Sequence, residues 1–242
     1  MKSPRGALTV LALALIAGCA SEPSAPSAIA DTFIGPDGLI AAPDDPPAAG
    51  EPWEMTSGTL FRADNTAWSG VPDDGRAQGS NGSAVFRMVS RERDFRDVDM
   101  TLTLRVDALS ETERTPAQGY DGAHIWVRYS SEAQLYAVSV DRRDGTMIVK
   151  KKCPGGDTNG GTYHDLSEPV RDAPIPLGEW QRIVVTVRDR SDGSVEIDAT
   201  RDGRSVRAVD TGVGCPVITE GGVGVRGDNA ELRFGSVIVA PV

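Results

Sequence analysis

One predicted strand, residues 123–129, carries side chains that could bind or transform a ligand. His124, Trp126 and Arg128 occupy alternate positions in it, and successive side chains of a strand point to opposite faces of the sheet. We therefore expect these three side chains on one face, and the other face is formed by Ala123, Ile125, Val127 and Tyr129. An imidazole, an indole and a guanidinium in one row are typical neither of a core face nor of an inert solvent face.

Further polar and aromatic side chains follow on the next predicted strands. If these strands are neighbours in one sheet, the ligand-binding set comprises His124, Trp126, Arg128, Gln134, Tyr136, Lys150, Lys152, Tyr163 and His164. Such a surface suits a sugar, because the C–H faces of sugars stack on Trp or Tyr while their hydroxyls need planar polar partners. In the alternative interpretation, Trp126 and Tyr136 are partly buried and the lysine stems only cover apolar surface.

The same face offers residue types for catalysis. In a polysaccharide lyase, His124 or Tyr136 would remove the proton beside a uronate carboxylate, and Arg128 would neutralise that carboxylate. Glycoside hydrolysis instead needs a pair of carboxylic acids. The nearest string, Glu196-Ile197-Asp198, alternates with apolar residues in a predicted hairpin, so we expect its acids to be solvated rather than catalytic.

Short alternating segments position these residues. Residues 97–106 place Val98, Met100, Leu102, Leu104 and Val106 on one face, which is typical of a half-buried strand. Asp-Gly pairs at 144–145, 192–193 and 202–203 predict hairpins. Ten to thirteen such strands without a convincing helix indicate an all-β, two-sheet antiparallel sandwich, because each half-buried sheet needs a second sheet to cover its apolar face.

The N-terminal residues predict an exported, anchored protein. Lys2 and Arg5 precede a short apolar stretch that ends in Leu15-Ile16-Ala17-Gly18-Cys19, which resembles a bacterial lipoprotein box and implies lipidation of Cys19. An ordinary secretory signal is the alternative. We expect residues 1–18 to be the signal peptide, residues 19–50 a Pro-, Ala- and Ser-rich tether, and residues 51–242 the sandwich. Apolar residues 33–34 and 39–40 could form a first strand or dock on the domain.

The remaining two cysteines are expected to pair. Outside the cytoplasm, Cys153 and Cys215 predict a disulfide across roughly sixty residues. Free thiols, or Cys153 as a nucleophile, are the alternative. The chain has no Cys-x-x-Cys motif or His cluster that would indicate zinc.

Composition excludes several classes of protein. The formal charge of −10 argues against a nucleic-acid binder, whose affinity depends on neutralising phosphates. No apolar run beyond the N-terminus is long enough for a membrane-spanning helix. We therefore expect contact with the membrane through the lipid anchor alone.

Two segments carry a resemblance to a known superfamily. The passage from Gly178-Glu179-Trp180 through Asp192-Gly193 to Asp202-Gly203 resembles concanavalin A-like lectin and glucanase sandwiches, particularly their laminin-G-like and family-16-hydrolase-like bacterial members. Residues 221–237 resemble their final two strands. The resemblance spans roughly residues 53–240 and implies a jelly roll whose concave sheet commonly holds a glycan.

The resemblance also leaves questions of cofactor and activity open. Some relatives carry structural calcium, but Ser236 replaces the frequent Asp of their last strand, which puts a calcium ion in doubt. No other cofactor is expected. We expect an extracytoplasmic, membrane-anchored protein that binds a polysaccharide on the concave face. The alternatives are a polysaccharide lyase or glycoside hydrolase using the same face, and a non-catalytic adhesion module that docks a protein there.

Overall fold

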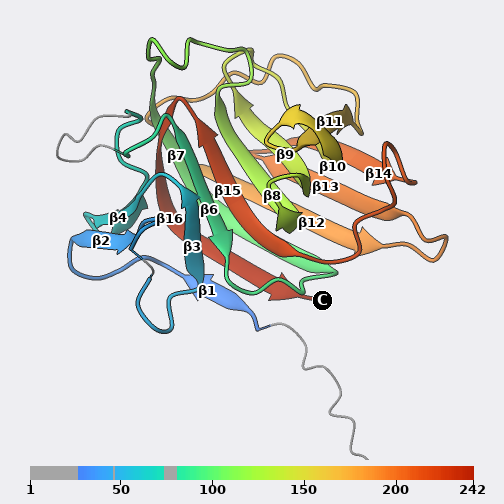
Figure 1. The fold of residues 1–242 in the computed structure, drawn as a ribbon, viewed down its shortest axis with the longest axis horizontal. Coiled ribbons are helices and arrows are strands. Elements are labelled where there is room, and N and C mark those ends of the chain that lie inside the picture. Colours follow the sequence, from blue (N-terminus) through green and yellow to red (C-terminus); the bar gives the residue numbers. More distant parts are fainter. Residues whose placement is uncertain (1–26, 46, 74–80) are drawn as a thin grey trace, which may run out of the picture.

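The chain forms a sandwich of two antiparallel β-sheets (Figure 1). The computed structural model describes residues 27–242 apart from residue 46 and residues 74–80, and this part of the chain contains sixteen strands and no helix. The prediction of an all-β, two-sheet sandwich is confirmed. The number of strands exceeds the expected ten to thirteen because four of the strands have only three or four residues.

The two sheets differ in size and in strand order. The nine-stranded sheet has the order β14 (Arg204–Asp210), β13 (Val195–Arg201), β12 (Gln181–Asp189), β7 (Val98–Leu109), β16 (Ala230–Pro241), β5 (Thr66–Trp68), β4 (Leu60–Ala63) and β2 (Gly38–Ala41), with β1 (Ile29–Asp31) also paired to β16. The seven-stranded sheet has the order β11 (Gly161–Asp165), β10 (Ile148–Thr158), β9 (Gln134–Arg142), β8 (Gly122–Ser131), β15 (Gly222–Asp228), β6 (Val85–Ser90) and β3 (Trp53–Ser57).

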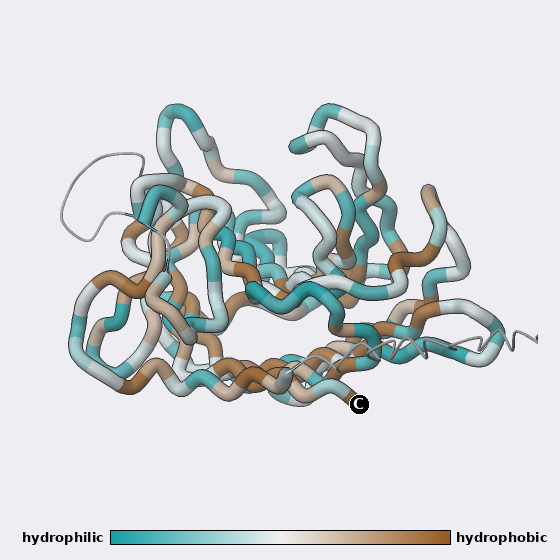
Figure 2. The backbone as a smooth tube through the Cα atoms, turned by 60° about the horizontal axis from the view of Figure 1, so that its bottom comes forward, coloured by the Kyte–Doolittle hydropathy of each residue, from teal (hydrophilic) through white to brown (hydrophobic). Residues whose placement is uncertain are grey.

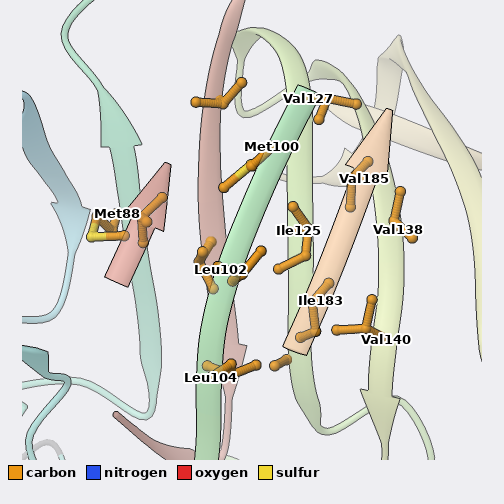
Figure 3. Close-up of a cluster of buried hydrophobic side chains, with 14 of the residues drawn as sticks. Met88, Met100, Leu102, Leu104, Ile125, Val127, Val138, Val140, Ile183 and Val185 are labelled. Atoms are coloured by element: carbon orange, nitrogen blue, oxygen red, sulfur yellow. The ribbon is translucent and has the colours of Figure 1, made fainter. Parts of the chain in front are cut away.

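Alternating side chains of the two sheets meet in one core. Leu102 of β7 lies close to Ile125 of β8, and Ile183 and Val185 of β12 lie close to Val140 and Val138 of β9 (Figure 3). These side chains are buried, and full burial of one such side chain contributes roughly 1.5–3 kcal/mol. The loops that project from the sandwich are largely hydrophilic (Figure 2). The alternation of β7 thus places every second side chain from Val98 to Val106 in the core, as predicted.

The predicted hairpins are present. Strands β9 and β10, β12 and β13, and β13 and β14 are antiparallel neighbours. In the last turn, Asp202 and Gly203 both have positive φ, 45° and 86°, as the two central residues of a type I′ turn require. The three Asp-Gly pairs therefore mark reversals of the chain, as expected.

The folded domain begins earlier than predicted. Strand β1 pairs with β16 and β2 pairs with β4, while Phe33 between them is buried against Phe234 at a ring distance of 6.4 Å. The segment 29–41 therefore lies within the sandwich, on the N-terminal side of the predicted boundary at residue 51, and the expectation that residues 33–34 and 39–40 form a strand or dock on the domain is confirmed. This segment docks because it supplies backbone groups to two sheet strands and an aromatic side chain to the core.

Cys153 and Cys215 form the predicted disulfide, which joins β10 to the loop before β15. The predicted signal peptide and Cys19 lie outside the described residues. No membrane-spanning helix is found in the part of the chain that the structure describes.

Candidate functional site

Strand β8 presents His124 and Trp126 on the face of the seven-stranded sheet that points away from the core. We call this the site face; it is formed by His124, Trp126, Ala137, Ser139, Lys150, Tyr163 and Arg226. Ala123, Ile125 and Val127 point the other way and are buried in the core. The predicted alternation therefore holds for the first five residues of the segment.

Arg128 does not share the site face, and this part of the prediction is wrong. A β-bulge follows Val127, and Arg128 has a φ of 47°. The bulge changes the alternation, so the guanidinium is fully buried at the end of the core. There it donates to the carbonyl oxygen of Ile218 at 2.7 Å and to Asp189 Oδ1 at 2.8 Å. Arg128 is a structural residue in this position.

Trp126 lies on the predicted face but is covered, with an exposed fraction of 1%. Its indole stacks on the Tyr129 ring, with centroids 5.3 Å apart and planes 9° from parallel. The prediction that Trp126 is an open stacking surface is therefore wrong. Trp126 belongs to a second apolar cluster with Val89, Tyr129, Leu135, Ala137 and Tyr163. Of these residues, Trp126, Ala137 and Tyr163 line the site.

Tyr136 faces the core, so its assignment to the binding face and to a catalytic role is also wrong. Its hydroxyl donates to Asp210 Oδ2 at 2.6 Å and accepts from the Ile218 amide at 3.0 Å. Lys151 Nζ forms an ion pair with the same carboxylate at 2.7 Å. Burial, and then the hydrogen bond to Asp210, raise the pKa of Tyr136 well above its ordinary value, so the hydroxyl stays protonated and does not supply a phenolate base.

The lysines of β10 occupy different depths. Lys150 lines the open site, and its Nζ pairs with Asp165 Oδ1 at 2.9 Å. Lys152 is buried below Tyr163, with Nζ 5.1 Å from the ring centroid, and donates to the Glu132 carbonyl oxygen. Burial, followed by repulsion from the nearby Arg226 and Arg87, lowers the pKa of Lys152 to about 8. Of the two lysines, only Lys150 lines the pocket.

Of the remaining predicted residues, Tyr163 lines the site, and His164 and Gln134 lie outside it. Tyr163 of β11 lines the site, and burial raises its pKa. His164, the next residue, points the other way and packs against Gly214. Gln134 lies at the start of β9, opposite Ser131, and outside the residues that line the pocket. The structure therefore brings His124, Trp126, Lys150 and Tyr163 together around one hollow.

This hollow is a pocket of about 290 Å³ on the site face. Its lining residues are Tyr120, His124, Trp126, Ala137, Ser139, Arg142, Lys150, Thr158, Tyr163, Arg226 and Asp228. Its volume is close to the lower end of the usual range for ligand pockets, ~300–1,000 Å³. A smaller hollow of about 210 Å³ adjoins it and shares Tyr120, Arg226 and Asp228.

A hydrogen-bonded network fixes the polar wall of the pocket. His124 Nδ1 lies 2.8 Å from Ser139 Oγ, and His124 Nε2 lies 3.3 Å from Asp228 Oδ2. Arg226 Nε and Nη2 donate to the two oxygens of Asp228, each at 2.6 Å. Burial raises the pKa of Asp228, but the charge of Arg226 and the hydrogen bonds from His124 and Arg226 outweigh it and hold this pKa far below its ordinary value.

Sequence reasoning missed the residues that complete the pocket. Arg226 and Asp228 lie on β15 opposite His124 and Gly122, respectively, and their alternation in Val-Arg-Gly-Asp was the available signal. Arg142 and Ser139 come from β9. Tyr120 precedes β8 in a loop and keeps 47% of its surface exposed. No strand periodicity reaches Tyr120, so only the fold reveals its place at the pocket.

The candidate acids Glu196 and Asp198, and Ser236 in the last strand, lie outside the pocket. Glu196 and Asp198 lie on β13 of the nine-stranded sheet, where both contact Arg207. Ser236 contacts Thr103, with the two hydroxyl oxygens 3.3 Å apart. No group of three or more His, Cys, Asp or Glu side chains that could hold a metal ion is found among the described residues.

Comparison with solved structures identifies the fold. A carbohydrate-binding module from Bacillus subtilis aligns with a TM-score of 0.51 and 14% identity, covering 75% of this chain and 91% of the module. β-Agarase B from Zobellia galactanivorans aligns at 0.55 and 10%, covering 89% and 93%. A β-1,3-1,4-glucanase (lichenase) from a mouse hindgut metagenome aligns at 0.52 and 10%, covering 89% and 100%.

These alignments confirm the expected concanavalin A-like jelly-roll fold. The aligned structures include both a carbohydrate-binding module and enzymes that act on glycans. At these sequence identities the likeness concerns the fold alone. No protein-family model and no curated protein matches the sequence.

Proposed function

We propose that this chain is a lipid-anchored, extracytoplasmic protein that binds carbohydrate in the pocket of the site face. The observation that carries the proposal is the combination of an exposed aromatic ring, Tyr120, with a fixed polar wall in one hollow. Carbohydrate recognition needs both parts, because the apolar face of a sugar stacks on an aromatic ring and its hydroxyls require oriented donors and acceptors.

Tyr120 takes the role that the sequence assigned to Trp126. Its ring stands at the rim and borders both the main pocket and the adjoining hollow. A sugar stacked there would lie above the apolar floor formed by Trp126 and Ala137. Stacking of this kind contributes a free energy comparable to base–aromatic stacking, ~1–3 kcal/mol.

The fixed network supports binding more directly than catalysis. Both ring nitrogens of His124 already contact protein groups, Ser139 and Asp228. Asp228 is the only carboxylate among the described residues that line the pocket, whereas glycoside hydrolysis generally uses two. Groups held in this way can orient hydroxyls without reorganising when the ligand binds.

The structural neighbours support the same class of ligand. One is a carbohydrate-binding module, and two are a β-agarase and a β-1,3-1,4-glucanase. Carbohydrate binding is thus a recurrent property among proteins with this fold, and the pocket supplies suitable chemistry in this chain.

A glycan array with matched variants tests the proposal. Wild-type protein and the Trp180→Ala variant should bind the same glycans, because Trp180 is an exposed indole outside the pocket. Tyr120→Ala should weaken binding roughly 5- to 150-fold, the equivalent of ~1–3 kcal/mol. Equal binding by Tyr120→Ala and wild type would show that the glycan does not bind in this pocket.

Mass spectrometry of the incubated glycans separates the remaining functions. Unchanged glycans accompany a binding protein, whereas new reducing or unsaturated ends would establish a hydrolase or lyase. A folded wild-type protein that binds no glycan would favour the adhesion module.

The anchor is tested separately through Cys19. The proposal predicts that wild-type protein sediments with membranes and incorporates a labelled fatty acid, because acyl chains on one cysteine hold a protein at the bilayer. Cys19→Ser should lose both properties. Retention of the label by this variant would contradict lipidation at Cys19.

A further inference from the structure

Two cations of the pocket wall face the ligand space while their carboxylate partners lie outside it. Arg142 and Lys150 line the main pocket. Arg142 donates to Asp144, and Lys150 pairs with Asp165. Arg142 and Lys150 also line a second hollow of about 200 Å³, and Asp144 and Asp165 line that hollow but not the main pocket. The two cations therefore lie between the hollows, with both carboxylates on the side away from the main pocket.

The opposite wall does not cancel this charge. Arg226 and Asp228 form a bidentate ion pair within the pocket lining, so their charges largely offset each other. Arg142 and Lys150 remain as the excess charge of the lining. They carry this excess in a protein whose formal net charge is −10, which makes the pocket a local exception to an acidic molecule.

A further cation lies behind the pocket lining. Lys152 is buried against Tyr163, and burial first, then the charges of Arg226 and Arg87, lower its pKa. A buried ammonium group loses its proton more readily where neighbouring cations outweigh the anions. A ligand anion entering the pocket would relieve that repulsion.

Both wall cations can turn to a ligand at low cost. Their present ion pairs are partly exposed, with side-chain exposures of 35% for Asp144 and 61% for Asp165. Partly exposed pairs of this kind contribute little to stability. A ligand carboxylate or sulfate in the less hydrated pocket would form stronger, charge-assisted hydrogen bonds.

We infer that the pocket recognises an acidic sugar, whose carboxylate or sulfate group is bound between Arg142 and Lys150. This inference rests on the proposed carbohydrate binding and narrows its ligand class. The chemistry shared by the two groups is a compact anion with several acceptor oxygens. Uronate-containing and sulfated glycans are the two sources.

Titration calorimetry with matched oligosaccharides tests the inference. The probes are oligogalacturonate, its fully methyl-esterified neutral form, alginate oligosaccharides, carrageenan oligosaccharides and neutral galacto-oligosaccharides. We expect at least one acidic probe to bind at least tenfold more tightly than the neutral probe with the same backbone. Its affinity should fall as the salt concentration rises from 50 to 500 mM, because salt screens partly exposed charges. Preference for the galacturonate and alginate probes identifies a carboxylate, and preference for carrageenan identifies a sulfate.

Variants assign the effect to the pocket. Lys150→Gln should weaken binding of the acidic probe by about tenfold or more, whereas Lys150→Arg should retain most of it. Arg207→Gln removes the same charge from β14 of the other sheet and should leave binding unchanged. Melting temperatures close to that of wild type establish that each variant is folded.

The possible failures are distinguishable. Suppose that neutral probes bind as tightly as acidic ones and that Lys150→Gln leaves the affinity unchanged. This result would overturn the acidic ligand and leave carbohydrate binding intact. A folded wild-type protein that binds none of these probes or the arrayed glycans would remove the proposed function and this inference with it.

Discussion

The ion pair between Asp228 and Arg226 should stabilise the whole domain as well as shape the pocket. Asp228→Asn removes the negative charge from a carboxylate that accepts two hydrogen bonds from Arg226 and contacts His124. The side chains of Asp228 and Arg226 are only 7% and 14% exposed. Removing one partner of a buried ion pair costs about 3–5 kcal/mol, because the other charge is left without compensation.

We therefore expect Asp228→Asn to lower the free energy of unfolding by about 3–5 kcal/mol. For a domain of this size, that loss corresponds to a fall in Tm of roughly 6–20 °C. Urea unfolding followed by tryptophan fluorescence measures the free energy at constant temperature. The matched control is Glu196→Gln, which breaks exposed ion pairs with Arg190 and Arg207 and should cost less than ~1 kcal/mol.

The same variant has a defined pH dependence. The pKa of Asp228 is held below its ordinary value in the folded protein, whereas an unfolded Asp titrates near ~3.9. The advantage of wild type over Asp228→Asn should therefore be constant above about pH 5 and shrink as the pH falls through this value. A loss in the variant of less than ~1 kcal/mol at pH 7, or an advantage that grows in acid, would refute the assignment of a buried, charged pair.

Two further predictions concern the disulfide and the buried lysine. The double variant Cys153→Ala/Cys215→Ala frees a cross-link between residues 62 apart and should lose about 4 kcal/mol in urea unfolding, by the chain-entropy relation. Reductant should bring wild type to the same value, and a loss below ~1 kcal/mol would contradict this. The folded state releases the proton of Lys152 near pH 8 and the unfolded state near ~10.4, so the stability of wild type relative to Lys152→Met should rise between these pH values. A pH-independent difference between the two proteins would show that Lys152 is not perturbed.

The sandwich was predictable because its strongest signals are local. In β7, apolar and polar residues alternate without interruption, and every apolar position from Val98 to Val106 is buried. The Asp-Gly turns fix hairpins through backbone conformations that few other residue pairs adopt. The disulfide followed from the expected extracytoplasmic location and from the number of cysteines. None of these inferences required knowledge of distant contacts.

The site was predictable only in part, because it depends on which face of each strand is turned to the core. Strand β9 is buried on both faces from Leu135 to Asp141, so its sequence does not reveal which face belongs to the core. A shift of one residue exchanges the faces, and this placed Tyr136 wrongly. The bulge after Val127 had the same effect on Arg128.

Contacts between distant segments explain the other differences. Trp126 is covered because Tyr129 and Tyr163 close over it, and Tyr120 reaches the pocket from a loop. Strand β1 joins the sheet through β16, at the other end of the chain, while β2 pairs with the nearby β4. The pairing of β1 follows only from the complete topology, so the composition of this segment indicated a tether.

The central claim is that carbohydrate binds on the site face rather than on the outer face of the nine-stranded sheet. NMR chemical-shift mapping with a glycan that binds in the array tests it most directly. The account predicts shifts at Tyr120, His124 and Arg226, and at the indole N–H of Trp126, with the indole N–H of Trp180 unchanged. Shifts centred on Trp180, with the pocket signals unmoved, would contradict the account.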